Sequence, residues 1–376
     1  MKSTEWEDFW WNNITGANMI VVKVSDTLNE NKMVVLNVPS DLPWRYQMRS
    51  AIELHFRKNA ETEDTYMQII DAMDECRDED PGKFLLTKFG KTREIKNGYR
   101  EKSGVSIQKY LIQNRVLKNT IVWIKGLNQK QIKGWMTFCR EYNTQSVSDG
   151  LFVLEVHDNK DAIDNKKTTL INFSDYVSSY NVQLFDSLIL DKENCYTTNW
   201  KKYISTITSC LCDTDAEISL ELIRHTDFLH ENPIEGISRI DKSGSYASRG
   251  SDEGSSHVLA YYRRGEEGEL KHRMWVAQVQ VLFPLIEIER TKLISTLYDQ
   301  IKKALTSDAI YQYNVIIKDP NEVELGTLDY LKRSFKINIP QADIRSWISF
   351  LHSCRNKIAH MECCEPEDVV KLLNMG

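Results

Sequence analysis

The chain has 376 residues, of which 41% are hydrophobic and 27% charged, a balance typical of a globular protein with two or three domains. Its formal net charge of −6 at pH 7 argues against broad nonspecific binding to nucleic acid, so any such contact has to be local. No apolar run is long enough to span a bilayer, and the N-terminus lacks a basic segment followed by an apolar core. These features predict a cytoplasmic protein with no membrane partner.

Potential metal ligands are scattered along the sequence. The chain has eight cysteines, and no pair of them has the C-x-x-C spacing of a zinc or redox site. The histidines form no ligand cluster, and the neighbouring carboxylates Asp158 and Asp161 lack a third ligand. We therefore expect reduced thiols, no metal and no cofactor.

Residues 1–173 alternate between two kinds of hydrophobic pattern. Runs rich in β-branched residues predict strands, and longer capped segments predict helices. The strands are expected at 19–24, 33–38, 120–124, 151–156 and 168–173, and the helices at 44–58, 65–77, 106–117 and 130–142. Strands separated by helices pair in parallel through crossovers, so this region is predicted to be an α/β domain with a parallel sheet.

This order of elements resembles that of P-loop NTPases of the AAA+ or STAND kind, with a helical, lid-like region at 174–230. The phosphate-binding chemistry of those families is missing here. After the strand at 33–38 the chain reads PSDLPWRYQMRS, with neither the glycines nor the Lys-Ser/Thr pair of a phosphate loop. The strand at 120–124 is followed by Lys125-Gly126 and not by carboxylates that could hold Mg²⁺. The resemblance implies a degenerate P-loop-like scaffold, on which Arg45 and Arg49 either grip a phosphate or form a solvated helix face.

Residues 231–269 contain six of the sixteen glycines and seven serines, without a sustained helical period. We interpret them as a linker or long loop. Within this segment, Tyr261, Tyr262, Arg263 and Arg264 combine aromatic and basic side chains, which can stack on and pair with single-stranded RNA. The same cluster is also typical of an edge strand or a docking contact.

Residues 270–376 have a helical pattern that predicts an all-α bundle. A long first helix is interrupted by Pro284, so a kink or break is expected near Phe283. A polar segment at 307–322 then leads to a helix at 323–335, and Pro340 begins the next helix.

The helix at 342–361 carries an apolar stripe at i, i+3, i+4 spacing, and Arg355 falls inside it. A buried arginine needs a partner, because removing its charge from water is costly. Asn356 and His360 are four residues apart and share the adjoining polar face.

The hexapeptide from Arg355 to His360 resembles the Arg-polar-x-x-x-His signature of HEPN domains. These helical bundles occur in metal-independent ribonucleases, toxins and antiviral effectors of prokaryotes. The resemblance implies an endoribonuclease that acts on RNA, a homodimer in which two such motifs meet, and a possible antitoxin or defence-complex partner. Because inactive members exist, two other functions stay open: a noncatalytic assembly protein and a nucleotide-responsive regulator.

RNA carries its own nucleophile, the ribose 2′-OH, so cleavage needs proton transfer and charge neutralisation but no metal. On this hypothesis His360 transfers protons, Arg355 binds the phosphate, and Asn356 orients either the phosphate or His360 by hydrogen bonding. A structural role is possible for each. His360 would then offset the dipole at its helix end, Arg355 would pair with Glu289, and His352 would be a boundary residue.

Overall fold

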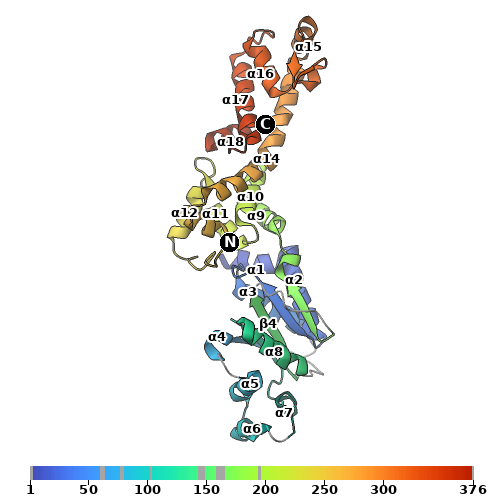
Figure 1. Cartoon of the computed structure of the whole chain (residues 1–376), viewed down its shortest axis with the longest axis vertical. Helices are drawn as coiled ribbons and strands as arrows, with labels where there is room; N and C mark the ends of the chain where they lie inside the picture. The colour runs from blue at the N-terminus through green and yellow to red at the C-terminus, as the bar shows by residue number, and fades with distance from the viewer. Residues whose placement is uncertain are drawn as a thin grey trace. The chain divides into compact units, whose positions relative to one another are not determined.

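The computed structural model describes residues 3–59, 64–76, 80–101, 104–142, 149–157, 166–193 and 196–374. Asp158 and Asp161 lie outside the described residues. The chain divides into two compact units, Met1–Asn181 and Val182–Gly376 (Figure 1). Within the described residues, no helix is both long and apolar enough to cross a membrane.

The first unit is built on a five-stranded sheet in which every pairing is parallel, with strand order β2-β3-β4-β1-β5. This confirms the α/β architecture with a parallel sheet that was predicted for the N-terminal domain. The strands are β1 Met33–Val38, β2 Tyr66–Asp71, β3 Thr120–Lys125, β4 Leu151–His157 and β5 Thr168–Asn172. The helices are α1 Ser3–Asn13, α2 Thr15–Asn29, α3 Arg45–Asn59, α4 Ala72–Glu75, α5 Pro81–Phe89, α6 Arg93–Gly98, α7 Ile107–Gln113, α8 Gln129–Glu141 and the 3-10 helix η3 Phe173–Asp175.

Two predictions for this unit were wrong. The strand predicted at 19–24 belongs to helix α2, because Ile20, Val21, Val24 and Leu28 follow helical spacing and are all buried. The helix predicted at 65–77 is strand β2 followed by the short helix α4. As an edge strand paired only with β3, β2 is mostly half-buried and lacks the continuous apolar run of β3 or β4.

The second unit is mainly helical. Its helices are α9 Ser179–Glu193, α10 Thr198–Cys212, α11 Ala216–Arg224, α12 Pro233–Lys242, α13 Val258–Arg263, α14 Glu267–Thr296, α15 Tyr298–Ser307, α16 Leu325–Arg333, α17 Ala342–Ala359 and α18 Pro366–Leu373, with η4 at Pro320–Glu322. Helix α14 continues through Pro284, so of the expected kink or break near Phe283 the break does not occur. Pro284 and Gln280 are exposed, and water can satisfy the Gln280 carbonyl that loses its helical donor.

The C-terminal region is not purely helical, because the predicted polar segment at 307–322 contains a small hairpin. Strands β6 Tyr311–Gln312 and β7 Val315–Ile316 pair antiparallel. Tyr313 and Asn314 between them have φ values of 50° and 63°. Two successive residues with positive φ make the tight turn that suits a hairpin.

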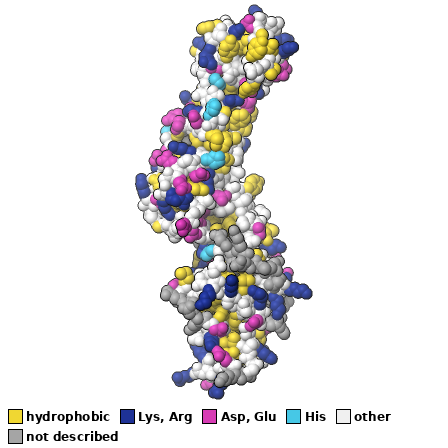
Figure 2. Space-filling view, viewed as in Figure 1, with side chains coloured by type: hydrophobic (Ala, Val, Ile, Leu, Met, Phe, Trp, Pro, Cys, Tyr) yellow, Lys and Arg dark blue, Asp and Glu magenta, His cyan; other side chains and the backbone are white. Residues whose placement is uncertain are grey.

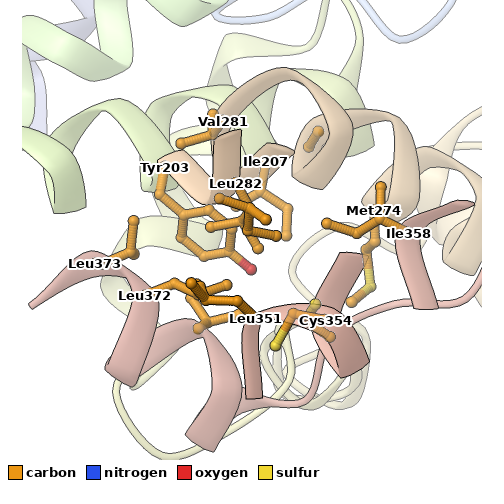
Figure 3. Close-up of a cluster of buried hydrophobic side chains, with 14 of the residues drawn as sticks. Tyr203, Ile207, Met274, Val281, Leu282, Leu351, Cys354, Ile358, Leu372 and Leu373 are labelled. Atoms are coloured by element: carbon orange, nitrogen blue, oxygen red, sulfur yellow. The ribbon is translucent and has the colours of Figure 1, made fainter. Parts of the chain in front are cut away.

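One hydrophobic core runs through the second unit, from Leu190 to Leu373. Figure 3 shows part of it, where side chains of α10, α14, α17 and α18 meet. The interpretation of 231–269 as a linker or long loop was wrong for α12 and α13, since Ile237 and Ile240 of α12 and Val258 and Leu259 of α13 are buried in this core. The separate regions predicted at 174–230 and 270–376 likewise share this one core. The glycine and serine content of this segment had indicated a flexible connection. Most of its glycines and serines lie between α12 and α13, and the two helices themselves are packed.

Candidate functional site

Helix α17, which carries Arg355 and Asn356, packs its apolar side into the core of the second unit. Ile348, Leu351, Cys354 and Ile358 are buried, and the Trp275 indole of α14 donates a hydrogen bond of 2.7 Å to the Ile358 carbonyl. Figure 3 shows Leu351, Cys354 and Ile358 in the shared core. The core therefore fixes the rotation of α17 about its axis, and this decides which of its polar side chains reach solvent.

Arg355 lies at the edge of the apolar stripe, with its side chain 30% exposed. Its guanidinium is 3.4 Å from Glu324 Oε2, and the Tyr313 hydroxyl donates to the same oxygen at 2.8 Å. The predicted pairing with Glu289 was wrong, because Glu289 pairs with Lys292 one turn away on its own helix. Arg355 is thus an accessible cation. Its partner, the Glu324 carboxylate, is half-exposed and lies at a long distance for an ion pair.

Asn356 contacts His352 one turn earlier, with 3.0 Å between Asn356 Nδ2 and His352 Nε2. An amide nitrogen can only donate, so His352 Nε2 accepts and the ring proton sits on Nδ1. That Nδ1 is 3.4 Å from Asp329 Oδ2 on α16. His352, expected to be a boundary residue, therefore links the Asn356 amide to a carboxylate of the neighbouring helix.

Asp329 is a buried carboxylate at the centre of the contact between α16 and α17. Lys332 Nζ lies 2.6 Å away, Arg333 Nε 2.9 Å, and the Ser349 hydroxyl donates at 3.1 Å. Burial raises the pKa of Asp329, but the hydrogen bonds from Lys332 and Ser349 outweigh it and hold the pKa below its usual value. His352 therefore faces an ionised carboxylate at neutral pH.

His360 is exposed and lies at the C-terminal cap of α17, where its backbone N–H donates to the Asn356 carbonyl at 3.0 Å. Five residues at about 100° each place it roughly 140° around the axis from Arg355. Asn356 lies between the two. A single copy of α17 therefore presents the cation and the imidazole in divergent directions.

The sequence pattern missed Glu324, Asp329 and His352. Each acts across the contact between α16 and α17, which no spacing within one helix specifies. Only the i, i+4 relation of His352 to Asn356 could have been found beforehand.

The arginines predicted to bind RNA make contacts within the chain. Arg263 donates to Asp241 Oδ1 at 2.6 Å and to backbone carbonyls of residues 246–249. Arg264 donates to both carboxylate oxygens of Glu266 at 2.9 Å. These arginines hold the connection between α12 and α13.

The two tyrosines of the same cluster are also engaged. Arg264 and Arg273 lie 5.2 and 4.9 Å from the Tyr261 ring centroid, and the Tyr262 hydroxyl donates to Ser238 at 2.8 Å. The cluster is part of the packed fold of the second unit, which leaves the prediction of RNA contact there with little support.

In the first unit, Arg49 is buried and bonded to Glu155 through Nε at 3.0 Å and Nη2 at 2.7 Å. Glu155, on β4, is fully buried and also accepts from the Trp123 indole at 2.7 Å. Arg45 lies 3.4 Å from the same carboxylate. The prediction of a solvated face was wrong for Arg49. The Glu155 carboxylate therefore pairs with the two arginines, Arg45 and Arg49, that were candidates for binding a phosphate.

One set of possible metal ligands appears that the sequence did not predict. Ligand atoms of Cys354, Cys364 and Asp368 all lie within 4.8 Å of one another. The two cysteines are ten positions apart, on α17 and just before α18, so their proximity depends on the packing of those helices. No disulfide joins any of the seven cysteines among the described residues.

No family model matches the chain, and no curated protein matches it. Among solved structures, it is similar to a chain of Drosophila ORC bound to DNA, with 9% identity, coverage of 95% of this chain and 85% of that one, and a TM-score of 0.33. For the Aeropyrum pernix ORC2 protein in ADPNP and ADP complexes the identity is 10%, the coverage 90% and 93%, and the TM-score 0.32. Likenesses this remote carry no argument about what the chain binds.

Proposed function

We propose that the chain is a metal-independent endoribonuclease whose reacting groups lie at the C-terminal end of α17. The observation that carries the proposal is the fixed position of Asn356 between two accessible groups. His352 contacts its amide and is itself in contact with Asp329, while Arg355 and His360 reach solvent on either side. The resemblance of the hexapeptide to HEPN domains supports the same chemistry.

In the proposed reaction the ribose 2′-oxygen attacks the adjacent phosphorus and the bond from phosphorus to the 5′-oxygen breaks. The products are a 2′,3′-cyclic phosphate and a free 5′-hydroxyl. Arg355 leaves Glu324 and neutralises the phosphate oxygens, an exchange that costs little because half-exposed ion pairs are weak. His360 gives a proton to the departing 5′-oxygen. The Asn356 oxygen orients the 2′-OH by accepting its hydrogen bond, and the 2′-OH loses its proton to solvent water as the 2′-oxygen attacks.

The divergence of Arg355 and His360 on one helix supports a homodimer through the C-terminal helices. A second copy would bring its own arginine to the phosphate opposite the first copy's histidine. Light scattering at tens of micromolar tests this, since a monomer that still cleaves RNA would contradict it.

Labelled RNA incubated with the full chain in EDTA tests the proposed activity. Loss of a general acid or base costs about 10² to 10⁴ in rate, so His360→Ala should lower cleavage by that factor. His230→Ala is the matched control, because His230 is an exposed histidine of the same unit, paired with Asp227 on its own turn. Cleavage by His360→Ala at the parental rate would make the histidine structural.

The HEPN resemblance supports a toxin or antiviral defence setting, in which an antitoxin or defence-complex partner would restrain the enzyme. Expression of the parent chain should then arrest bacterial growth while His360→Ala does not. Equal growth of the two strains, with both proteins accumulating, would contradict this setting.

A noncatalytic assembly protein is the second candidate, and the β6–β7 hairpin favours it. Large apolar side chains there and beside α16 are exposed: Tyr311, Tyr313, Val315, Ile316 and Phe335. Figure 2 shows hydrophobic side chains on the surface at the end of the second unit that carries α15 and α16. Dimerisation that Phe335→Ser abolishes, in a protein that never cleaves RNA, would favour assembly over catalysis.

A further inference from the structure

The end of α17 carries a second group of polar side chains, on the side facing α18, whose chemistry suits a metal ion. Cys354 and Cys364 are buried, with 1% and 4% of their surfaces exposed, and Asp368 is half-buried in the first turn of α18. We propose that Cys354, Cys364 and Asp368 bind one zinc ion that joins α17 to α18. The proposal does not depend on the ribonuclease activity.

The spacing of the ligand atoms fits zinc. Zinc lies about 2.3 Å from thiolate sulfur and about 2.0 Å from carboxylate oxygen, so tetrahedral ligands stand roughly 3.3 to 3.8 Å apart. The two sulfurs and a carboxylate oxygen all lie within 4.8 Å of one another. Small side-chain rotations bring them to the required separation, and solvent on the Asp368 side can supply the fourth ligand.

The backbone of Cys364 is fixed from both sides by one buried side chain. Gln278 Oε1 accepts from the Cys364 N–H at 2.7 Å, and Gln278 Nε2 donates to the Cys364 carbonyl at 3.1 Å. Cys354 is fixed by its place on α17 within the shared core. These two hydrogen bonds with Gln278 keep the Cys364 thiol close to Cys354. Binding a metal therefore requires little further loss of conformational freedom at these two cysteines.

The charges around the three ligands also fit a divalent cation. Two thiolates and one carboxylate carry a charge of −3, and zinc carries +2. Lys357 supplies the remaining +1, because its Nζ lies 2.8 Å from Asp368 Oδ2. A carboxylate has a second oxygen, so Asp368 can keep the lysine and still bind metal. Buried charge is tolerated only when it is balanced, and this set is neutral once zinc is bound.

Soft thiolates with one carboxylate favour zinc over magnesium or calcium, which prefer oxygen ligands alone. The ion would be structural. It would fix the end of α17 next to Arg355 and Asn356 and would take no part in the proposed RNA chemistry.

The full chain, reduced and dialysed against trace Zn²⁺, tests the proposal. Elemental analysis should find about one zinc per chain, as in a structural site. Cys364→Ser should lose most of it. Cys363→Ser is the matched control: this neighbouring thiol is half-buried and points to the Lys271 carbonyl, so its loss should leave the zinc content unchanged. Co²⁺ in place of zinc should give the sulfur-to-cobalt absorption of a thiolate site in the parent and in Cys363→Ser only.

A measurement on the parent protein covers the case in which Cys364→Ser fails to fold. Zn²⁺ should slow alkylation of Cys354 and Cys364 at least tenfold, read from their peptides by mass spectrometry, while Cys363 reacts at an unchanged rate. Equal alkylation with and without Zn²⁺ would overturn the proposal. So would zinc retained equally by Cys364→Ser, or a Cys354–Cys364 disulfide that forms in air and is not prevented by Zn²⁺.

Discussion

Asp186 on α9 should make the stability of the protein fall as pH rises from about 4 to about 7. Its side chain is fully buried and accepts hydrogen bonds from the Thr208 and Ser219 hydroxyls, while its Oδ1 has no partner among the described residues. Burial raises the pKa of Asp186 from 3.8 to about 7, although the two hydroxyls lower it in part. The folded state therefore keeps a proton that the unfolded chain has already released.

The sign follows from proton binding. Between about pH 4 and pH 7 the folded state binds more protons at this site than the unfolded state, so unfolding becomes easier as pH rises. One pKa unit corresponds to about 1.4 kcal/mol, so roughly three units amount to at most about 4 kcal/mol. Of this, about 2 kcal/mol is lost between pH 5 and pH 7, and almost nothing is left to lose above about pH 8.

Asp186→Asn removes the ionisation but keeps an oxygen that can accept from both hydroxyls. Relative to the parent, its free energy of unfolding should be about 3 kcal/mol larger at pH 8 than at pH 5, because the parent loses stability over this range and the variant does not. Guanidinium denaturation at several pH values measures this difference. Asp191→Asn is the control, since Asp191 lies on the same helix but is 64% exposed and paired with Lys201. Parallel pH profiles for Asp186→Asn and the parent would refute the reasoning.

Three further outcomes are expected. Arg49→Leu should destabilise the first unit by about 3 to 5 kcal/mol in chemical denaturation, because it leaves the buried Glu155 carboxylate without its main partner; a change below 1 kcal/mol would contradict this. ATP should bind weakly or not at all by calorimetry, since that same carboxylate holds the cations a phosphate would need, and a low micromolar dissociation constant would be the contrary result. Arg263→Ala should speed amide exchange in residues 243–257 while leaving RNA affinity unchanged, whereas lost affinity with unchanged exchange would restore the predicted RNA contact.

Much of the fold could be predicted because the local hydrophobic pattern of the sequence indicates many of its helices and strands. Strand β3 is a continuous apolar run, and α17 has a regular stripe, so both were located nearly to the residue. Failures occurred where local preference and tertiary context disagree. The β-branched residues of α2 favour a strand in isolation, yet their spacing buries one helical face, and tertiary burial outweighs propensity.

The candidate site was predictable only in part, for the same physical reason. The signature residues lie within one helix, so their spacing is visible in the sequence. Their partners are not, because Glu324 and Asp329 reach Arg355 and His352 through the packing of α16 on α17. The Gln278 side chain that fixes Cys364 acts over a separation of 86 residues, which no short motif can encode.

His352 should act on RNA cleavage only through Asn356, which rests on the proposed ribonuclease activity. Both of its ring nitrogens face protein groups, Asp329 on one side and the Asn356 amide on the other, so the ring offers no nitrogen to a substrate. His352→Ala and Asn356→Ala should therefore each slow cleavage by a similar factor, about tenfold for the loss of one well-placed neutral hydrogen bond. The double variant should be no slower than either single one, since the two residues act as a unit. Single-turnover rates of the four proteins measure the coupling, with melting temperatures to show that each is folded. Independent effects that multiply in the double variant would mean that His352 touches the substrate itself, and the role assigned here to the Asp329–His352 contact would be wrong.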